Sequence, residues 1–324
     1  MTARIPTGEP TLPSCCIAYT PDPAYLFPAL VSAAQARRHA SAEKADVVIF
    51  CFGLDRSTEL VFSAICESEG VLLYAVGLDV IHGATAMMSR LFLGDFAPAM
   101  YTQYLYLDGD VQIVGSLDPL IDAEVPPGRF MAANDPLTFQ VEDNSPQSRG
   151  LMRHLTRIGF THKQACTYFN SGVLRINRAG WDKIGAHAWE LFSTSKGSEK
   201  FPDQDVLNLV GGEHRIPMSL GWNFPIFMRN SRVEAEIQPR ILHFMSNPKP
   251  WQGEFPPWTR EHCAPYLEMI RRYPVLARFN TTMPFKKRAY YHLQQRRKRM
   301  SETVTWGFSK RRSRILDYEV ALIA

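Results

Sequence analysis

The chain has 324 residues, of which 45% are apolar and 21% are charged, and its formal net charge is +4. This composition is typical of a globular protein and excludes a chain that is disordered throughout. The longest apolar stretch, residues 47–54, is too short to cross a bilayer, and residues 1–14 lack the apolar segment of a signal peptide. The six cysteines show no Cys-x-x-Cys spacing, which predicts a reducing compartment and no structural zinc. We therefore expect a soluble or peripheral protein.

The first third of the chain alternates strand-like and helical patterns. In chain order these patterns predict a strand at 14–19, a helix at 25–38, a strand at 47–52, a helix at 58–69, a strand at 71–76 and a helix at 83–93 that contains Arg90. This β-α-β-α-β order indicates a parallel sheet with nucleotide-binding potential.

The most informative stretch is residues 103–111, an apolar and aromatic run that ends in Asp108 and Asp110. Its bulk is typical of a strand buried on both faces, and ligands of open α/β sheets bind beyond the carboxyl ends of the strands. Alternation places both carboxylates on one side, and Gly109 allows close approach by a ligand. Such oxygen ligands favour Mn²⁺ or Mg²⁺ with open positions for a diphosphate. Asp-x-Asp also arises by chance, however, and Asp-Gly is an ordinary turn.

After Asp110, the pattern predicts a turn and a short helix at 113–120 and a strand at 129–134. Because this strand ends at Asp135, a third carboxylate could face the same cleft. The polar segment 140–147 is expected to be a mobile loop.

Residues 167–177 predict another strand, which Asn170 and Gly172 interrupt. An amide and a glycine there indicate close approach by a ligand, although a bulge would use the same glycine. Two helical patterns follow, over residues 178–192 and from Pro202 to residue 210. Capping of the second helix explains Asp203 or Asp205 as well as a functional role does.

A histidine, His243, closes a further apolar strand and precedes Lys249, six residues later in a proline-rich loop. The pair could supply a nitrogen ligand for a metal and a cation for phosphates. Mn²⁺ accepts one imidazole among oxygen ligands, whereas Mg²⁺ seldom does. Each residue alone has a simpler explanation, as a hydrogen-bonded core histidine and a solvated lysine.

The C-terminal segment is strongly basic. Residues 285–315 contain eleven Lys and Arg against the single acid Glu302, with aromatic side chains between the charges. This pattern suits an anionic membrane surface, where each basic residue contributes about 1 kcal/mol of attraction. Counterion release would reward the same residues on nucleic acid, and a solvated tail is the simplest alternative. We predict a domain at 1–275 and a basic, aromatic tail at 276–324.

Five motifs in this order resemble glycosyltransferase family 8, which includes bacterial lipopolysaccharide galactosyl- and glucosyltransferases and glycogenin. They are SRLFLG at 89–94, YLYLDGD at 104–110, FNSGVL at 169–174, DQDVLN at 203–208 and HF with KPW between 243 and 251. The resemblance covers residues 14 to about 252. It implies an α/β fold of the GT-A, Rossmann-like type, with a mixed, mostly parallel sheet flanked by helices. It also implies a retaining hexosyltransferase that uses a UDP-sugar donor and Mn²⁺ or Mg²⁺.

The resemblance also implies a role for each matching residue. The implied metal ligands are Asp108, Asp110 and His243. The implied donor-binding residues are Tyr19, Thr20, Arg90, Asp108, Gly109, Asn170, Ser246 and Lys249, the last on the diphosphate. The residues expected around the sugar and acceptor are Asp135, Asn170, Asp203 and Gln204. Two departures from the family pattern are the lack of an acid or amide at 19–20 for the base and ribose, and Ser246 in place of a common glycine.

A retaining enzyme ordinarily places a carboxylate nucleophile beneath the anomeric carbon. Gln204, which the resemblance places there, is an amide and a poor nucleophile. We therefore expect front-face substitution, with Asp203 as the reserve nucleophile.

Two other classes of function remain open. One is a metal-dependent nucleotidyltransferase or phosphohydrolase on a similar sheet, and the other is a non-catalytic protein that binds an anionic surface through its tail. We favour transfer from a UDP-hexose to a saccharide or glycolipid acceptor, such as lipopolysaccharide or another cell-surface glycan. The expected location is cytoplasmic and peripheral at the inner face of the cell membrane, with the tail on the anionic surface and no nucleic-acid partner.

Overall fold

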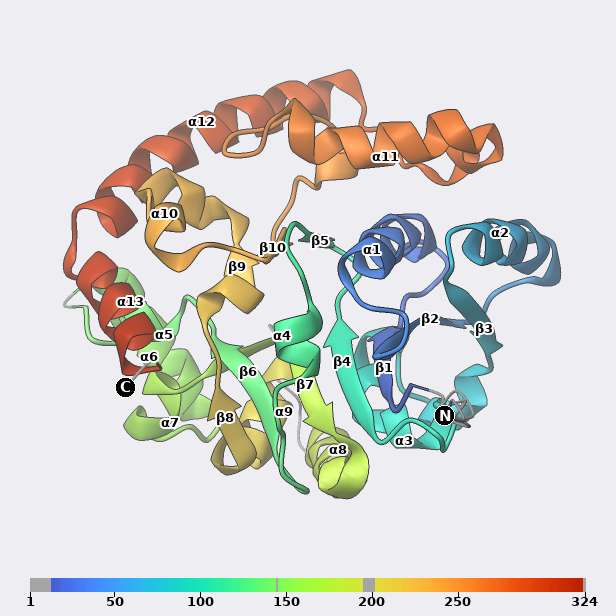
Figure 1. Cartoon of the computed structure of the whole chain (residues 1–324). Helices are drawn as coiled ribbons and strands as arrows, with labels where there is room; N and C mark the ends of the chain where they lie inside the picture. The colour runs from blue at the N-terminus through green and yellow to red at the C-terminus, as the bar shows by residue number, and fades with distance from the viewer. Residues whose placement is uncertain (1–12, 144, 195–201, 323–324) are drawn as a thin grey trace, which may run out of the picture.

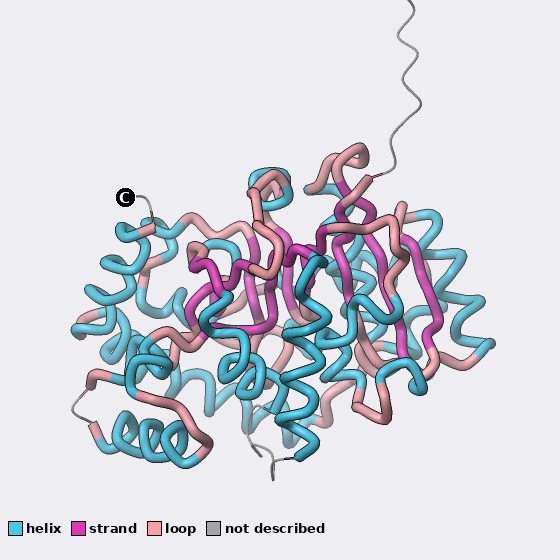
Figure 2. The backbone as a smooth tube through the Cα atoms, turned by 90° about the horizontal axis from the view of Figure 1, so that it is seen from below, coloured by secondary structure: helices cyan, strands magenta, loops and turns pink. Residues whose placement is uncertain are grey.

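The computed structural model describes residues 13–143, 145–194 and 202–322. Within these ranges a mixed seven-stranded sheet lies between layers of helices, which confirms the predicted α/β architecture (Figures 1 and 2). The strand order is β3-β2-β1-β4-β7-β6-β8. The strands are β1 (Cys15–Tyr19), β2 (Ala45–Phe52), β3 (Leu72–Val76), β4 (Gln103–Leu107), β6 (Phe130–Asn134), β7 (Phe169–Asn177) and β8 (Arg215–Pro217).

The strands β3, β2, β1 and β4 run parallel, whereas β7 is antiparallel to both of its neighbours. The outermost strand β8 is parallel to β6, so most neighbouring pairs are parallel. A second sheet, which the sequence did not predict, has the order β5-β10-β9. Its strands are β5 (Val111–Ile113), β9 (Phe224–Pro225) and β10 (Ile241–His243). The chain passes from β4 into β5 through residues 108–110, so this turn joins the two sheets.

Alternate side chains of the central strands enter two different apolar cores. Along β1, Ile17 packs with α1 (Leu26–His39) and α2 (Arg56–Ser68). Ala18 instead belongs to the core on the opposite face, which also contains residues of α8 (Arg178–Thr194) and α9 (Pro202–Gly211). Burial of both faces explains why these strands read as continuous apolar runs.

The predicted helices over residues 25–38, 58–69 and 178–192 are confirmed within a few residues, although α8 is interrupted at Ala179 and Gly180. The predicted helix at 83–93 is instead a 3₁₀ helix, η2 (Ala86–Phe92). The remaining α-helices are α3 (Leu93–Phe96), α4 (Asp118–Ile121), α5 (Thr138–Val141), α6 (Pro146–Arg157), α7 (His162–Cys166), α10 (Glu234–Ile237), α11 (Arg260–Arg272), α12 (Phe285–Gly307) and α13 (Lys310–Ala321). The remaining 3₁₀ helices are η1 (Leu78–Ile81), η3 (Gly212–His214), η4 (Leu220–Trp222), η5 (Ile226–Ser231), η6 (Pro250–Gln252) and η7 (Pro274–Phe279).

The prediction of a loop over residues 140–147 is wrong at both ends of the segment. Helix α5 ends at Val141 and α6 begins at Pro146, while residue 144 lies outside the described residues. Between the helices, Asp143 accepts hydrogen bonds from Arg311 and Arg314 of α13. The sequence signal was misleading because polar side chains here pair with a distant basic helix instead of with water.

The basic C-terminal segment forms two helices that wrap around the body of the protein (Figure 1). Trp306 of α12 and Ile315 of α13 are buried in the same apolar core as α1. The Trp306 ring meets Phe227 of η5 edge-to-face, with centroids 5.4 Å apart. These contacts tie the segment to the rest of the fold, and the domain boundary at residue 275 stays a prediction. Within the described ranges, no helix has the length and apolarity that crossing a membrane requires.

Two nearby aromatic residues test how firmly this segment is anchored. We expect Trp306→Ala to lower the free energy of unfolding by about 3–5 kcal/mol, because Trp306 is 5% exposed and leaves a cavity. Phe308→Ala, two residues on, should change it by less than about 0.5 kcal/mol, because that ring is 81% exposed. Urea unfolding of both variants makes the comparison, and equal losses would contradict the buried position of Trp306.

Candidate functional site

A cleft of about 720 Å³ opens at the carboxyl ends of the central strands. Most of the residues singled out from the sequence line it: Thr20, Arg90, Asp108, Gly109, Asp110, Asp135, Asn170, Asp203, Gln204, His243 and Ser246. Two others do not. Tyr19 is fully buried, and its hydroxyl lies 3.0 Å from that of Ser32. Its position therefore does not support the expected contact with the UDP-sugar. Lys249 lies beside the cleft and contacts Asp110.

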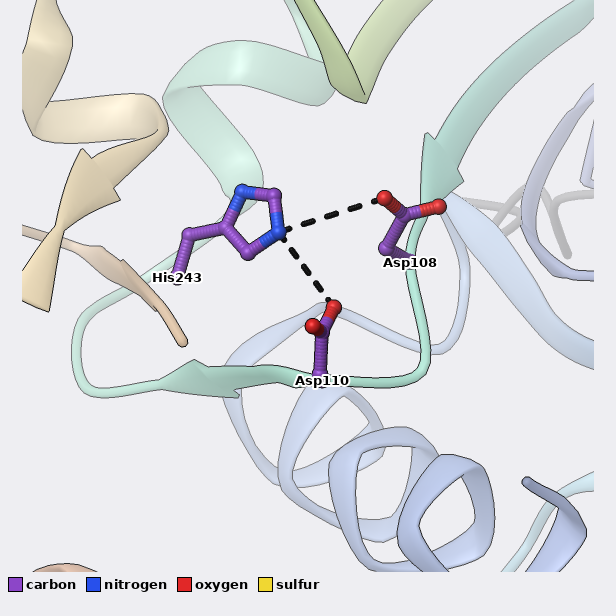
Figure 3. Close-up of side chains that lie close together, drawn as sticks. All are labelled: Asp108, Asp110 and His243. Atoms are coloured by element: carbon purple, nitrogen blue, oxygen red, sulfur yellow. Dashed lines mark ion pairs between the residues drawn. The ribbon is translucent and has the colours of Figure 1, made fainter. Parts of the chain in front are cut away.

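Three of the cleft residues converge on one point: Asp108, Asp110 and His243 (Figure 3). One ligand atom from each lies within 4.8 Å of the others. The Nε2 atom of His243 is 3.3 Å from Asp110 Oδ1 and 3.9 Å from Asp108 Oδ2.

Strand pairing explains how the histidine reaches the acids. In the second sheet β10 pairs antiparallel with β5, and His243 stands opposite Val111, the residue after Asp110. On the other side, the backbone N–H of Asp108 donates to the Gly172 carbonyl of β7 at 2.8 Å. The two sheets therefore hold the ligands from both ends of a short turn.

Gly172 makes room for these side chains. A Cβ added there would lie 2.4 Å from His243 Cε1 and 2.7 Å from Asp108 Oδ2. The groups that approach this position in the structure are the protein's own. The bulge that the sequence left open is present: β6 advances two residues from Ala132 to Asn134 while β7 passes from Leu174 to Phe169, so the extra residues of β7 surround Gly172.

The two acids have different electrostatic surroundings. Burial raises the pKa of Asp108, with a further increase from Asp110 and an opposing effect of Arg90. Burial also disfavours ionisation of Asp110, but Lys249 and His243 together lower its pKa below the ordinary value. Lys249 Nζ lies 2.5 Å from Asp110 Oδ2 and also donates to the Phe244 carbonyl.

Arg90 lies between Asp108 and Asp203 in the cleft. Its guanidinium lies 2.9 Å from Asp108 Oδ1 and 3.3 Å from Asp203 Oδ2, and it donates to the Ser171 carbonyl at 2.7 Å. It also stacks over the Tyr106 ring at 4.7 Å, and Tyr106 donates its hydroxyl to Asp108. This buried cation offsets the acids on either side of it.

The other predicted residues form a hydrogen-bonded group. Asp135 Oδ2 accepts from Asn170 Nδ2 at 3.0 Å and from Gln204 Nε2 at 3.2 Å. Gln204 Oε1 accepts from the Ser171 backbone N–H. Burial raises the pKa of Asp135, opposed by these hydrogen bonds.

Sequence reasoning missed three residues of the site. Tyr25 and Tyr106 line the cleft, and Asn223 hydrogen-bonds both His243 and Asn170 from behind it. Asn223 lies in residues 221–225, which no pattern marked. A polar residue just before a short apolar strand was the available signal.

The three side chains offer ligand atoms that suit a divalent cation. Two carboxylates and one imidazole offer hard oxygens and a single nitrogen, which suits Mn²⁺ better than Mg²⁺. The absence of a Cβ at Gly172 leaves space beside two of the three ligands, His243 and Asp108.

Comparison with known proteins identifies a family model and several relatives that match this chain. The family model "Glycosyl transferase family 8" matches residues 82–254. Over 253 residues the chain is 24% identical to lipopolysaccharide glucosyltransferase WaaO of Escherichia coli K12, which covers 72% of each protein. It is 28% identical to a lipopolysaccharide 1,2-glucosyltransferase of Escherichia coli over 56% of this chain and 52% of that protein.

Among solved structures, the galactosyltransferase LgtC in complex with donor and acceptor sugar analogues superposes with a TM-score of 0.60. The match covers 85% of this chain and 99% of LgtC at 20% identity, and therefore concerns the fold.

The contact at Gly172 can be tested directly. In Gly172→Ala the new methyl group would displace His243 or Asp108, so we expect Mn²⁺ affinity to fall by at least about 10-fold. Gly212→Ala is the matched control, because a Cβ at that glycine meets nothing within 4 Å. Electron paramagnetic resonance, which detects free Mn²⁺, measures the Mn²⁺ affinity of both variants. Unchanged affinity in Gly172→Ala would contradict the crowding.

Proposed function

This chain belongs to glycosyl transferase family 8 and is a glycosyltransferase, and on that premise we propose that it transfers a hexose from a UDP-sugar with retention of configuration. The proposed acceptor is a saccharide of lipopolysaccharide or another cell-surface glycan. One observation carries the proposal: two carboxylates and an imidazole meet in the cleft at the end of the central strand. Family membership sets aside the nucleotidyltransferase, phosphohydrolase and non-catalytic alternatives.

The residues around the proposed diphosphate have distinct tasks. Asp108, Asp110 and His243 would hold Mn²⁺, which when bound would act as a Lewis acid on the leaving UDP. Lys249 and Arg90 already lie against the two acids and would add positive charge where the leaving group becomes negative. Thr20 and Tyr25 line the cleft and are proposed to lie beside the nucleoside, while Gly109 and Ser246, which also line it, are proposed to lie nearer the diphosphate.

The transfer step is proposed to occur on one face of the sugar. The acceptor hydroxyl oxygen bonds to the anomeric carbon as the bond from that carbon to the phosphate oxygen breaks, and the hydroxyl proton passes to a phosphate oxygen. Both amide ends of Gln204 are engaged, one with Asp135 and the other with Ser171, which suits a positioning role. Asp203 is paired with Arg90 and stays the reserve nucleophile. Asp135 and Asn170 would orient sugar hydroxyl groups.

The acceptor class rests on the relatives. Two that match this chain are named as lipopolysaccharide glucosyltransferases. Three apolar side chains that line the cleft, Leu137, Ile226 and Phe227, are surfaces on which a pyranose ring can pack. These observations support a glycan acceptor and leave the donated hexose to be assayed.

Removing one carboxylate tests the proposed catalytic role. We expect Asp110→Asn to lower kcat/KM for a UDP-hexose by at least about 100-fold, because Mn²⁺ loses an anionic ligand and Lys249 loses its partner. Asp317→Asn, a change of the same kind at an exposed residue of α13, should keep full activity. Release of UDP with a panel of UDP-sugars is the assay. Full turnover in Asp110→Asn would refute the proposed metal role.

We also propose that the enzyme is cytoplasmic and associates with an anionic inner membrane surface through α12. Supporting this, Phe285, Met300 and Phe308 are 84%, 75% and 81% exposed among the basic residues of this segment. Rings and long cationic side chains of this kind suit the headgroup zone. Because Trp306 and Ile315 are buried, deleting the segment would expose the core, so charge substitution is the better test.

The vesicle test replaces four exposed basic residues of α12, Lys286, Lys287, Arg296 and Arg297, by Gln. Each lost charge should weaken binding to vesicles with anionic lipid by about 1 kcal/mol, less at high salt. The control variant replaces Arg149, Arg153, Arg157 and Lys163 by Gln, four exposed basic residues of α6 and α7. Equal losses in both variants would show that net charge acts without a specific surface.

A further inference from the structure

The side chain of Asn223 is a buried link between two parts of the cleft. It lies directly before β9 and is 2% exposed. Its amide is 2.8 Å from His243 Nδ1 on one side and 2.9 Å from Asn170 Oδ1 on the other.

One backbone group fixes the orientation of this amide. The Gly172 N–H lies 3.0 Å from the side chain of Asn170, and because an N–H only donates, the facing atom of Asn170 is its oxygen. The group of Asn223 that faces this oxygen must then be the NH₂. The remaining atom, the carbonyl oxygen of Asn223, faces His243 and can only accept. His243 therefore carries a proton on Nδ1.

The other nitrogen of the ring is thereby directed at the acids. Nε2 points toward Asp110 Oδ1 and Asp108 Oδ2, as Figure 3 shows. An imidazole that binds a metal ordinarily donates its second N–H to a fixed acceptor, which sets the tautomer and the ring orientation.

We propose that Asn223 is a positioning residue that holds His243 as the Nδ1–H tautomer and presents Nε2 to a divalent cation. This inference deepens the proposed function and rests on it for the identity of the cation. Through Asn170 the same amide extends to Asp135, so one hydrogen-bonded path connects the metal ligand to the proposed sugar site. The path is buried along its length.

The test begins with the metal-free, full-length protein labelled with ¹⁵N-histidine. Long-range ¹H–¹⁵N spectra at pH 8, assigned with His243→Gln, report the protonation of each ring nitrogen. We expect a protonated Nδ1 in the native protein, and an unprotonated Nδ1 would overturn the proposal without any variant.

Two variants of Asn223 then separate its two hydrogen bonds. Asn223→Ala removes both and should bind Mn²⁺ about 10–100-fold more weakly, with loss of the fixed Nδ1 proton. Asn223→Asp keeps an oxygen for Nδ1 but loses the donor to Asn170, so its His243 should keep the Nδ1 proton. Native Mn²⁺ affinity in Asn223→Ala would overturn the proposal.

The matched control is Asn230→Ala, a second buried asparagine seven residues later that donates to Glu302 instead. It should leave the His243 spectrum and Mn²⁺ affinity unchanged. These measurements use no sugar donor. A protein with the expected tautomer but without transfer activity would therefore refute the proposed function and leave the role of Asn223 intact.

Discussion

The site depends on the pairing of β10 with β5. This short pair of strands brings His243 beside the turn at residues 108–110, although more than 130 residues separate them in the chain. Because side chains alternate along a strand, a slip of one residue would turn His243 away from Asp108 and Asp110. The neighbouring positions in β10, Ile241 and Leu242, are buried in the main core and resist such a slip. Apolar packing thus fixes the geometry of a polar site.

The same pairing creates an electrostatic cost that the protein must offset. Two partly buried carboxylates close together repel each other and lose part of their hydration. Arg90 lies against Asp108 and Lys249 lies against Asp110, so each acid has its own cation. Removing one partner of such a pair leaves an unpaired charge and destabilises the folded protein, so the stability of the site depends on keeping both acids and both cations. The two cations are also positioned for an anionic ligand, so the groups that stabilise the free protein are the groups proposed to bind diphosphate.

The sequence predicted the residues of the site better than their contacts. The acids after β4 were found because a buried strand ends abruptly in charges, and His243 because it closes an apolar strand. Asn223 gave no such signal, since its role depends on two partners, His243 and Asn170, that are distant in the chain. Gly172 was noticed, but its reason lies in side chains of other strands. Local patterns report burial and period, whereas these roles arise only when strands are placed side by side.

The C-terminal helices show the same limit for a different reason. Residues 285–315 were interpreted from their charges and the aromatic residues between them, and this pattern does not reveal that Trp306 and Ile315 are buried. In the structure α12 packs on η5, whose first residues line the cleft. Helix α13 likewise contacts α5, which contributes Gln140 to the same cleft.

The proposed membrane surface and two walls of the proposed acceptor site therefore belong to one packed unit. Tyr318 of α13 strengthens this connection, because its hydroxyl donates to the Met218 carbonyl and accepts from the backbone N–H of Asn134, next to Asp135. Packed side chains therefore connect these helices with the elements that line the cleft. An enzyme with this arrangement would meet a membrane-anchored glycan with its acceptor wall already held in place from behind.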